Sequence, residues 1–452
     1  MDKEINRRKF LTTSGQAAAG LGLTLGASAA LSCKTTAAPA VGVGRSRRVG
    51  ANEKVTLGLI GCGGRGRHVM SIFQRFPDVE IAAVCDVYRP NCEKARGMTG
   101  GKATTYNDYR QLLERSDIDA VIVATNGHWH VLPTIHACEA GKDVYVEKPL
   151  GTSIGEGRAA VKAARRCDRI VHHGTQQRSM PHYARAVEII RSGKLGDISR
   201  VGVWDLENQW PGFGNPPDGD PPAGLDWDFW LGPAPPVPFN INRVHHHYWF
   251  FDYGGAWQLD WAVHHYDIVH WAMGVERPYA ATAMGGKLAF DDNREWPDTF
   301  EAICEYPPGP ASKRGFLLVY TFRGGCQRPI EQRFHGKAFY GTDATLVLNR
   351  NGYEIYSETR EGKKVVEEIR RGGSPEDGPH QRAFIEAVRS HERTTADIET
   401  AHYSSNPGHL MNIAWRVQQR IRWDAEKEQV VGDREANQLV TRKYRKPWAL
   451  PT

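Results

Sequence analysis

The sequence predicts an α/β fold, in which a doubly wound parallel sheet is followed by an α+β domain with an open, mainly antiparallel sheet. In residues 54–175 apolar strands alternate with helical stretches at the spacing of βαβ units, and from residue 198 strand-like runs follow one another. The chain has 452 residues, of which 40% are hydrophobic and 24% charged, enough for two or three domains with separate cores.

Charge and cysteine usage exclude several classes of protein. The formal net charge of +6 lies in the first 50 residues, and the body has no sustained run of Lys or Arg, so no nucleic-acid partner is expected. The eight cysteines are scattered without a C-x-x-C pair, which argues against a disulfide framework and a zinc knuckle.

Residues 1–33 are expected to be an export signal. Paired arginines within residues 6–11 precede a weakly apolar stretch rich in Gly and Ala over 17–31, which resembles a twin-arginine (Tat) signal. This stretch is too short and too weakly apolar to span a membrane comfortably. Ordinary cleavage and lipidation of Cys33 are the two alternatives for processing, and lipidation would be the sole membrane attachment. Residues 34–53 predict a flexible linker, so a periplasmic or cell-envelope location is expected.

The domain expected over 54–175 opens with a glycine-rich turn between a strand and a helix. The apolar strand 55–60 leads into G-x-G-x-x-G at 61–66 and a helix over 67–76. The first glycine permits a tight turn, the second lets the backbone approach a pyrophosphate, and the third lets helix and strand pack, with the helix N-terminus favouring phosphate. A Rossmann-type, NAD(P)-binding domain is therefore predicted, and its phosphate-side residues are Gly61, Gly63, Gly64, Arg65 and Gly66.

The end of the second strand, 80–85, carries the residue expected to choose the cofactor. Asp86 follows this strand and can accept hydrogen bonds from both adenosine ribose hydroxyls, which favours NAD over NADP. Arg89 is near enough to accommodate a 2′-phosphate, so NADP remains the alternative.

The pattern continues through a strand at 119–125, a helix at 132–140 and a strand at 143–147. Ligands on doubly wound sheets bind at the carboxyl ends of the strands. The residues expected at that edge are Thr125, His128, His130 and Lys148.

With Glu147-Lys148-Pro149 after such a domain, the sequence resembles the Gfo/Idh/MocA family of glucose–fructose oxidoreductases and inositol dehydrogenases, over essentially residues 54–450. The resemblance implies that Lys148 lies beside the nicotinamide and the substrate hydroxyl, and that a D-x-x-x-H motif, here Asp260 to His264, completes the site. It also implies that the second sheet covers the nicotinamide side of the first domain. Further residues implied near the cofactor or the substrate are Glu147, Gln176, Gln177 and Arg178; the alternative for the last three is a plain turn.

Asp260 and His264 are four residues apart, so we expect them on one helix face, with Asp267 on the next turn. Such a stripe on a helix of Trp, Ala, Val and Ile would be costly to bury for packing alone. Oxidation of a secondary alcohol needs a base, and an imidazole serves near neutral pH. His264 is the expected base or proton relay, Asp260 its orienter or the acceptor of a substrate hydroxyl, and Lys148 the stabiliser of a developing alkoxide.

Two departures from the family pattern affect the expected pocket. Residues 125–130 read Thr-Asn-Gly-His-Trp-His where the family usually has Thr-Pro and a polar residue, which changes the loop. Ala256 replaces the third glycine of a G-G-G turn and Trp257 follows it, so a narrower pocket wall is expected.

The domain expected over 176–452 combines substrate binding and oligomerisation, with helices at 376–391 and 399–420 and a tail, 437–448, that packs back across the body. Its expected strands are 198–208, 279–288, 300–306, 315–322, 332–340, 345–348 and 353–356. An insertion at 209–250 is rich in Pro and Gly, and eight of the 13 tryptophans lie in or beside it. Aromatic faces suit the C–H faces of sugar rings, although Trp227 and Trp230 could equally fasten the insertion to the domain.

His245, His246 and His247 are expected in an extended stretch, where neighbouring side chains alternate in direction. At most two of them could share an ion, so no metal site is expected, and His247 is assigned to substrate contact together with Trp257.

Three functions are compatible with these patterns. The first is an exported NAD(P)-dependent oxidoreductase of a sugar, sugar derivative or cyclitol, with tightly bound, internally recycled cofactor and a homo-oligomeric state of two or four chains. The second is an NAD-dependent, redox-assisted glycosidase or lyase; NAD-dependent α-N-acetylgalactosaminidases are similar over the first domain, but Glu147-Lys148-Pro149 and the Asp260/His264 pair fit the dehydrogenase branch better. The third, an inactive sugar-binding protein, is disfavoured because every expected polar residue is present.

Overall fold

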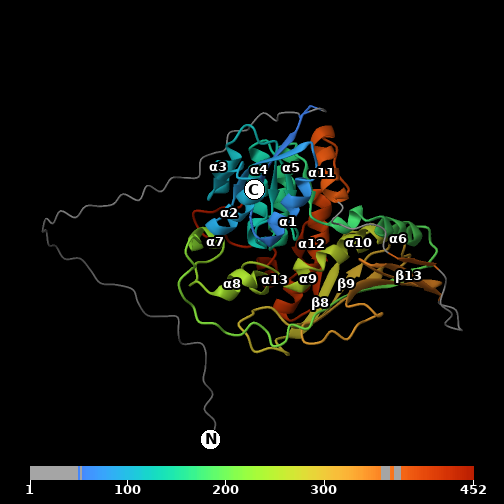
Figure 1. The fold of residues 1–452 in the computed structure, drawn as a ribbon. Helices are drawn as coiled ribbons and strands as arrows, with labels where there is room; N and C mark the ends of the chain where they lie inside the picture. The colour runs from blue at the N-terminus through green and yellow to red at the C-terminus, as the bar shows by residue number, and fades with distance from the viewer. Residues whose placement is uncertain (1–48, 51–52, 358–366, 371–377, 452) are drawn as a thin grey trace, which may run out of the picture. The chain divides into compact units, whose positions relative to one another are not determined.

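The structure is a computed structural model that describes residues 49–50, 53–357, 367–370 and 378–451 (Figure 1). The predicted export signal and most of the predicted linker lie outside the described residues. Within the described part of the chain, no helix is both long enough and apolar enough to cross a membrane.

The first sheet has six parallel strands in the order β3-β2-β1-β4-β5-β6. The strands are β1 (Val55–Ile60), β2 (Val79–Cys85), β3 (Thr104–Tyr106), β4 (Ala120–Val123), β5 (Asp143–Val146) and β6 (Val171–His173). The helices that connect them are α1 (Gly64–Phe73), α2 (Arg89–Met98), α3 (Tyr109–Leu113), α4 (Val131–Glu139) and α5 (Ile154–Arg166). Strands β4 and β5 are buried throughout because helices cover both faces of the sheet. This arrangement confirms the predicted doubly wound fold.

Helix α1 begins at Gly64, earlier than the predicted start at residue 67. Gly63 is its N-cap in an extended conformation, so the second half of the glycine-rich turn is already the first helical turn. The N-terminus of the helix therefore points directly out of the turn, as phosphate binding requires.

The second sheet has ten strands in the order β14-β13-β12-β11-β7-β10-β9-β8-β15-β16. Its strands are β7 (Ile198–Leu206), β8 (Ala280–Gly286), β9 (Thr299–Tyr306), β10 (Phe316–Arg323), β11 (His335–Gly341), β12 (Ala344–Asn349), β13 (Gly352–Ser357), β14 (Glu367–Arg370), β15 (Ile421–Asp424) and β16 (Gln429–Val430). Strands β7 and β10 pair in parallel and the other pairs are antiparallel, which confirms a mainly antiparallel sheet. Helices α6 (Pro181–Arg191), α10 (Val263–Met273) and α12 (Ile398–Val417) pack on it (Figure 1).

The insertion at 209–250 crosses from the second sheet to the first domain. It contains two short helices, α7 (Trp227–Leu231) and α8 (Ile241–His245). Before α7 it pairs with the loop after β2: the Arg89 N–H donates to the Gly224 carbonyl at 2.9 Å, and the Asp226 N–H donates to the Val87 carbonyl at 2.9 Å. We call residues 222–247 the strap.

The end of the chain returns to the first domain. Helix α11 (Pro379–Ser390) packs Phe384 edge-on against Phe73 of α1 at 6.0 Å, and Arg382 pairs with Asp78 at 2.8 Å. In the tail, Trp448 meets Trp129 edge-on at 4.8 Å, which confirms that the tail packs back across the body. Helix α11 and the tail therefore attach the end of the chain to the first domain, beside the cleft between the two sheets.

Candidate active site

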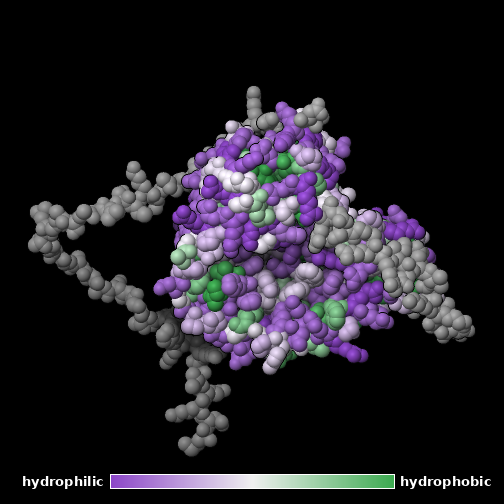
Figure 2. Space-filling model, in the orientation of Figure 1, coloured by the Kyte–Doolittle hydropathy of each residue, from purple (hydrophilic) through white to green (hydrophobic). Residues whose placement is uncertain are grey.

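A cleft lies where the carboxyl ends of β1, β4 and β5 face the second domain. It consists of two adjoining cavities of about 560 Å³ and about 550 Å³. Figure 2 shows the molecule hollowed between the regions of α1 and α9 (Trp257–Asp260). The residues common to both cavities are Gly63, Gly64, Ala124, Thr125, Asn126 and His247.

The glycine-rich turn has the shape that the motif predicts. Gly61 has a φ of +93°, and a Cβ there would lie 2.6 Å from the backbone of Ala124. A Cβ on Gly66 would lie 1.9 Å from the Gly61 carbonyl oxygen, so this glycine lets α1 pack against the turn. A Cβ on Gly63 would meet nothing within 4 Å, which leaves the backbone open to a ligand.

Asp86 lies in the second cavity at the end of β2. Its carboxylate accepts the N–H groups of Cys62 at 2.6 Å and Tyr88 at 2.8 Å, which fixes its orientation. Burial raises the pKa of Asp86 to about 6, although these two hydrogen bonds and the charge of Arg67 oppose the rise. Arg89 lies beside Asp86 in a shallow side opening of the cleft, so both residues that bear on cofactor choice reach the same edge.

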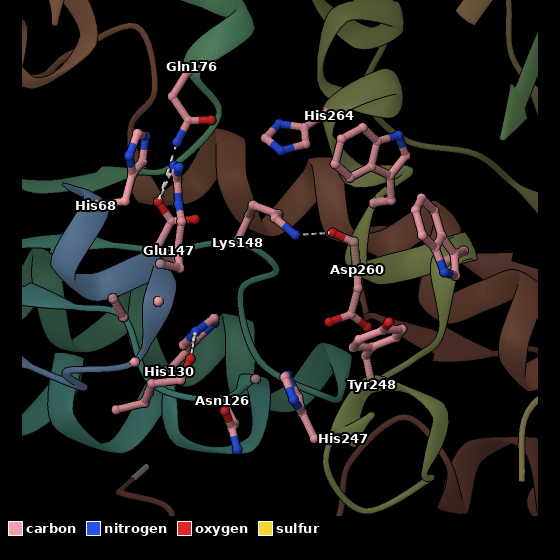
Figure 3. Close-up of a pocket in the computed structure, with 18 of the residues that line it drawn as sticks. His68, Asn126, His130, Glu147, Lys148, Gln176, His247, Tyr248, Asp260 and His264 are labelled. Carbon is pink, nitrogen blue, oxygen red and sulfur yellow. Dashed lines mark hydrogen bonds and ion pairs between the residues drawn. The ribbon is translucent and has the colours of Figure 1, made fainter. Parts of the chain in front are cut away.

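Glu147 anchors the wall between the glycine-rich turn and β6. It is buried, pairs with Arg65 at 2.7 Å and accepts the Gln176 side-chain amide at 3.3 Å (Figure 3). Burial alone would raise the pKa of Glu147, but the adjacent Arg65 guanidinium lowers it, so the residue is a carboxylate. Arg65, Glu147 and Gln176 all line the first cavity.

Lys148 meets Asp260 across the first cavity. Its ammonium donates to the main-chain carbonyl of Asp260, and the Asp260 carboxylate turns toward Tyr248 (Figure 3) and accepts the Gly255 N–H at 2.9 Å. Burial lowers the pKa of Lys148, and the charges of Asp260 and Glu147 oppose that change. Burial raises the pKa of Asp260 to about 6.

The prediction that Asp260, His264 and Asp267 share one continuous helix face is wrong. Helix α9 ends at Asp260 and α10 begins at Val263, so the chain bends between them. Ala256, with a φ of +54°, is the N-cap of α9, and the Asp260 carboxylate at the other end of this short helix accepts the Gly255 N–H at 2.9 Å. Asp267, beyond the bend at Trp261 and Ala262, does not line the cleft and accepts the Ser404 hydroxyl at 2.9 Å.

His264 is buried at the edge of the first cavity, beside Lys148 (Figure 3). Its Nδ1 has no hydrogen-bond partner among the described residues. Burial lowers the pKa of His264 well below its usual value, and the charges of Arg350 and Lys148 lower it further, so the ring is neutral at pH 7. A neutral imidazole with a free nitrogen is able to accept a proton.

Other predicted residues reach the cleft, with differing freedom. Thr125 lines both cavities, and its buried hydroxyl has no partner among the described residues. His130 lines the first cavity, but its ring nitrogens lie 2.7 Å from the Pro149 carbonyl and 3.0 Å from the Thr125 carbonyl. Trp257 lines the cavity and stacks on Phe322 with ring centroids 5.8 Å apart.

Besides Gly66, which packs α1 against the turn, three predicted site residues do not line the cleft. His128 is buried behind its wall, where Nε2 lies 2.9 Å from the Trp230 carbonyl. Gln177 accepts the buried Lys337 ammonium at 2.9 Å. Arg178 pairs with Asp267 at 2.7 Å. Their polar groups bind residues of other elements instead of a ligand. Because those partners are distant in the sequence, the sequence does not reveal these contacts.

The expectation of an extended run at His245, His246 and His247 is wrong. His245 ends α8 and His247 begins a short 3-10 turn, while His246 stacks on Phe213 at 4.2 Å. His247 lines both cavities, and burial lowers its pKa to about 4. The described residues contain no group of three or more His, Cys, Asp or Glu side chains arranged to hold a metal ion.

Trp227 packs inside the strap, whereas Trp230 joins the strap to His128 of the first domain, with ring centroids 5.2 Å apart, and also lines the cleft. The Trp227 indole N–H donates to the Val237 carbonyl at 2.9 Å, and its ring stacks on Trp230 at 4.7 Å. Trp230 in turn lines the second cavity.

Several residues of the first cavity are not among those predicted from the sequence. They are His68, Asn126, Tyr248, Trp261, Arg350 and Gln381. Arg350, in the turn between β12 and β13, approaches from a strand pair far along the chain, and only its position after a strand could have singled it out. Trp261 lies inside the D-x-x-x-H motif and could have been found there.

Family matches cover most of the chain. Residues 55–175 match the Gfo/Idh/MocA domain described as "Oxidoreductase family, NAD-binding Rossmann fold", and residues 187–283 and 320–450 match "Oxidoreductase family, C-terminal alpha/beta domain".

Curated relatives match part of the chain. A glycosyl hydrolase family 109 protein from Saccharopolyspora erythraea is 32% identical over 206 residues, and one from Shewanella pealeana is 31% identical over 218 residues. Each match covers 43% of this chain and 44% of the relative, so the chain spans less than half the length of these curated relatives.

Solved structures share the fold across both domains. Scyllo-inositol dehydrogenase from Lactobacillus casei, with bound NAD(H) and scyllo-inositol, is 18% identical with a TM-score of 0.58, and the likeness covers 82% of this chain and 99% of that one. Levoglucosan dehydrogenase, in complex with NADH and levoglucosan, is 16% identical with a TM-score of 0.62 over 82% of this chain and 99% of that one.

Proposed function

Because the chain belongs to the Gfo/Idh/MocA oxidoreductase family, whose first domain binds NAD, we propose that it oxidises a secondary hydroxyl of a sugar, sugar derivative or cyclitol. One observation carries this proposal: Lys148, Asp260 and His264 line the same cavity as the glycine-rich turn. The dehydrogenases of similar fold were solved with scyllo-inositol and with levoglucosan, which supports this substrate class.

The cleft fits a nicotinamide dinucleotide. The open backbone at Gly63, the N-terminus of α1 and the unpartnered hydroxyl of Thr125 suit phosphate and ribose groups, and Asp86 suits the adenosine ribose. When bound, NAD supplies the two-electron oxidation of the carbon that carries the hydroxyl.

Each polar residue has a distinct role in this proposal. His264 removes the hydroxyl proton, since its ring is neutral and lines the cavity. Lys148 stabilises the developing alkoxide from the position at which the Asp260 carbonyl holds its ammonium. Asp260 accepts a neighbouring hydroxyl while it remains bonded to Gly255.

Substitution of Lys148 and His264 tests these roles. Lys148→Ala and His264→Ala should each lower kcat by roughly 10²-fold or more, with cofactor affinity little changed. The assay follows reduced cofactor across a panel of sugars and cyclitols, and Lys162→Ala, an exposed lysine of α5, is the matched control. Near-normal turnover in either active-site variant would remove that residue from the mechanism.

The second candidate function is a redox-assisted glycosidase or lyase. The likeness to proteins named glycosyl hydrolase family 109 favours it. In that reaction the cofactor ends in its starting state, so a glycoside would be cleaved without net reduced cofactor. Assays on aryl glycosides and on free sugars therefore separate the two functions.

We further propose that the strap retains the cofactor through many turnovers. Its residues Leu225, Phe229, Phe239 and Val244 line the second cavity opposite Asp86, which supports slow release of the adenosine half. Internal recycling of a retained cofactor would suit an exported enzyme.

Export by the Tat pathway rests on the pattern of residues 1–33, as does lipidation at Cys33, and fractionation of cells that express the full chain tests both. We also propose that the chain forms a dimer or tetramer, which size-exclusion chromatography with light scattering would test.

A further inference from the structure

The first cavity contains an arginine that has no acidic partner in the part of the chain that the structure describes. Arg350 lines the cavity from the β12–β13 turn, and its guanidinium lies over the Trp261 ring at 4.9 Å. Among the described residues, its buried Nε has no hydrogen-bond partner and no carboxylate forms an ion pair with it. A half-buried cation of this kind is costly unless an anion meets it.

The two carboxylates of the cavity equal its other positive charges in number. Arg65 is paired with Glu147 at 2.7 Å. Lys148 bonds the Asp260 carbonyl, and the Asp260 carboxylate is the second and last acidic side chain among the described lining residues. Three Lys or Arg side chains therefore face two carboxylates, and Arg350 is the excess positive charge.

We propose that the substrate is an acidic sugar or cyclitol, and that Arg350 binds its carboxylate or sulfate ester. This rests on the proposed function and narrows its substrate class. A guanidinium presents paired N–H donors that match either anion, and Trp261 holds the fork in place. Trp257 and Trp261 provide aromatic faces on the same wall for the C–H face of the ring.

The adenosine end of the dinucleotide is a poor partner for Arg350. Asp86, which suits the adenosine ribose, and Arg89, which could meet a 2′-phosphate, lie at the second cavity and its side opening, and Arg350 lines neither. An anion at Arg350 would also affect the chemistry. The positive charge of Arg350 disfavours protonation of His264, so an anionic substituent there would make His264 a better proton acceptor.

Binding to the NAD-loaded enzyme tests the proposal independently of turnover. Glucuronic acid and glucose 6-sulfate are compared with glucose by quenching of tryptophan fluorescence and by calorimetry. We expect at least one of the two acidic sugars to bind about 10- to 100-fold more tightly than glucose, the scale of a charge-assisted hydrogen bond. The two acidic arms distinguish a carboxylate from a sulfate ester.

Variants then assign the preference to Arg350. Arg350→Gln should remove the preference for the acidic sugar and leave NAD affinity unchanged, Arg350→Lys should keep part of it, and Arg185→Gln, an exposed arginine of α6, should keep all of it. Equal affinity of the unmutated enzyme for acidic and neutral sugars would overturn the proposal, as would an undiminished preference in Arg350→Gln or a loss of NAD binding in that variant. Arg350-dependent binding of an acidic sugar that is never oxidised would instead refute the proposed function and keep the anion site.

Discussion

At the scale of single residues, Asp260 links the two sides of the candidate site. Its main-chain carbonyl accepts the Lys148 ammonium, and its carboxylate accepts the Gly255 N–H at 2.9 Å. The main-chain carbonyl of Asp260 holds Lys148 whether or not the Asp260 carboxylate is protonated, so that carboxylate can change its charge without releasing Lys148. We therefore expect protonation of Asp260 to alter turnover without moving Lys148.

The pH dependence of kcat follows from this separation. Burial raises the pKa of Asp260 to about 6, so the carboxylate is lost as pH falls through 6 and kcat at saturating cofactor should fall with it. His264 does not contribute this limb, because its pKa lies well below its usual value. The measurement is kcat from pH 5 to 8. In Asp260→Asn, kcat should be lower and the acid limb should disappear; an unchanged limb would contradict the assignment.

Asp86 should set the choice of cofactor. Its carboxylate lies at the end of β2, where it would pair with ribose hydroxyls and repel a 2′-phosphate, so NAD should bind more tightly than NADP. Asp86→Ala should reduce the ratio of NAD affinity to NADP affinity by roughly tenfold, on the scale of one charge-assisted interaction. Calorimetric titration of both cofactors measures it. Tighter NADP binding by the unmutated protein would assign the preference to Arg89 instead.

Residues with a local signal could be predicted from the sequence, and residues defined by distant partners could not. Gly61 and Gly66 follow from the motif, and the structure gives each the expected reason for lacking a side chain. Gln177 and Arg178 have the polar character of site residues, but Lys337 and Asp267 engage them away from the cleft. Arg350 shows the reverse case, since nothing nearby in the chain indicates that its turn reaches the cavity.

At the scale of elements, the pattern of apolar residues predicted the strands more accurately than the break between two helices. The parallel strands β1 and β4 are short apolar runs that contain β-branched residues, and their length favours strands over helices. The bend between α9 and α10 was missed because Trp261 and Ala262 interrupt the helix without a proline or glycine to mark the break, and spacing alone does not reveal it. The bend is what separates Asp260 from Asp267 and turns them to different sides.

Glu428 joins three elements, and its loss should destabilise the protein. In the turn between β15 and β16 it accepts Arg158 of α5 at 2.7 Å and His402 of α12 at 2.6 Å. Burial raises its pKa, but hydrogen bonds from His402 and Arg158 lower it to about 2. Because the folded-state pKa lies below the ordinary value, this stabilisation is fully present above pH ~4.5 and is lost as pH falls toward 2.

Glu428→Gln should therefore lower the free energy of unfolding at pH 7 by roughly 1–3 kcal/mol, the cost of leaving a partly buried cation short of its partner. Urea denaturation at pH 7 and pH 3 measures the change, which should be smaller at the lower pH. Glu426→Gln is the matched control, since Glu426 forms an exposed ion pair with Arg277 in the same turn. Equal effects of the two substitutions would contradict the assignment.

At the scale of the whole molecule, the cleft depends on parts of the chain that return from the second sheet. Phe384 and Ile385 of α11 belong to the same apolar cluster as β1 and β2, and Ile398 and Ala401 of α12 pack in the cluster on the other face of the first sheet. Each helix has an apolar face that the sequence shows, but the pattern does not indicate which domain that face meets. The core of the first domain therefore includes residues of α11 and α12, which lie far beyond the boundary expected at residue 176.

The strap lines the second cavity, where we propose that the adenosine half binds, and the last prediction concerns how long the cofactor stays there. Protein purified without added nucleotide should contain about one NAD(H) per chain, because release requires the contacts of Gly224 and Asp226 with the β2 loop to open. Leu225→Asp places a charge in the apolar lining and should speed release by about tenfold or more, whereas Ala223→Asp, at an exposed position of the same loop, should not. Stopped-flow displacement of bound NADH measures the rate. A chain that is empty when purified, needs millimolar added NAD and releases NADH in each cycle would show that the strap does not retain the cofactor and that the enzyme works as an ordinary dehydrogenase.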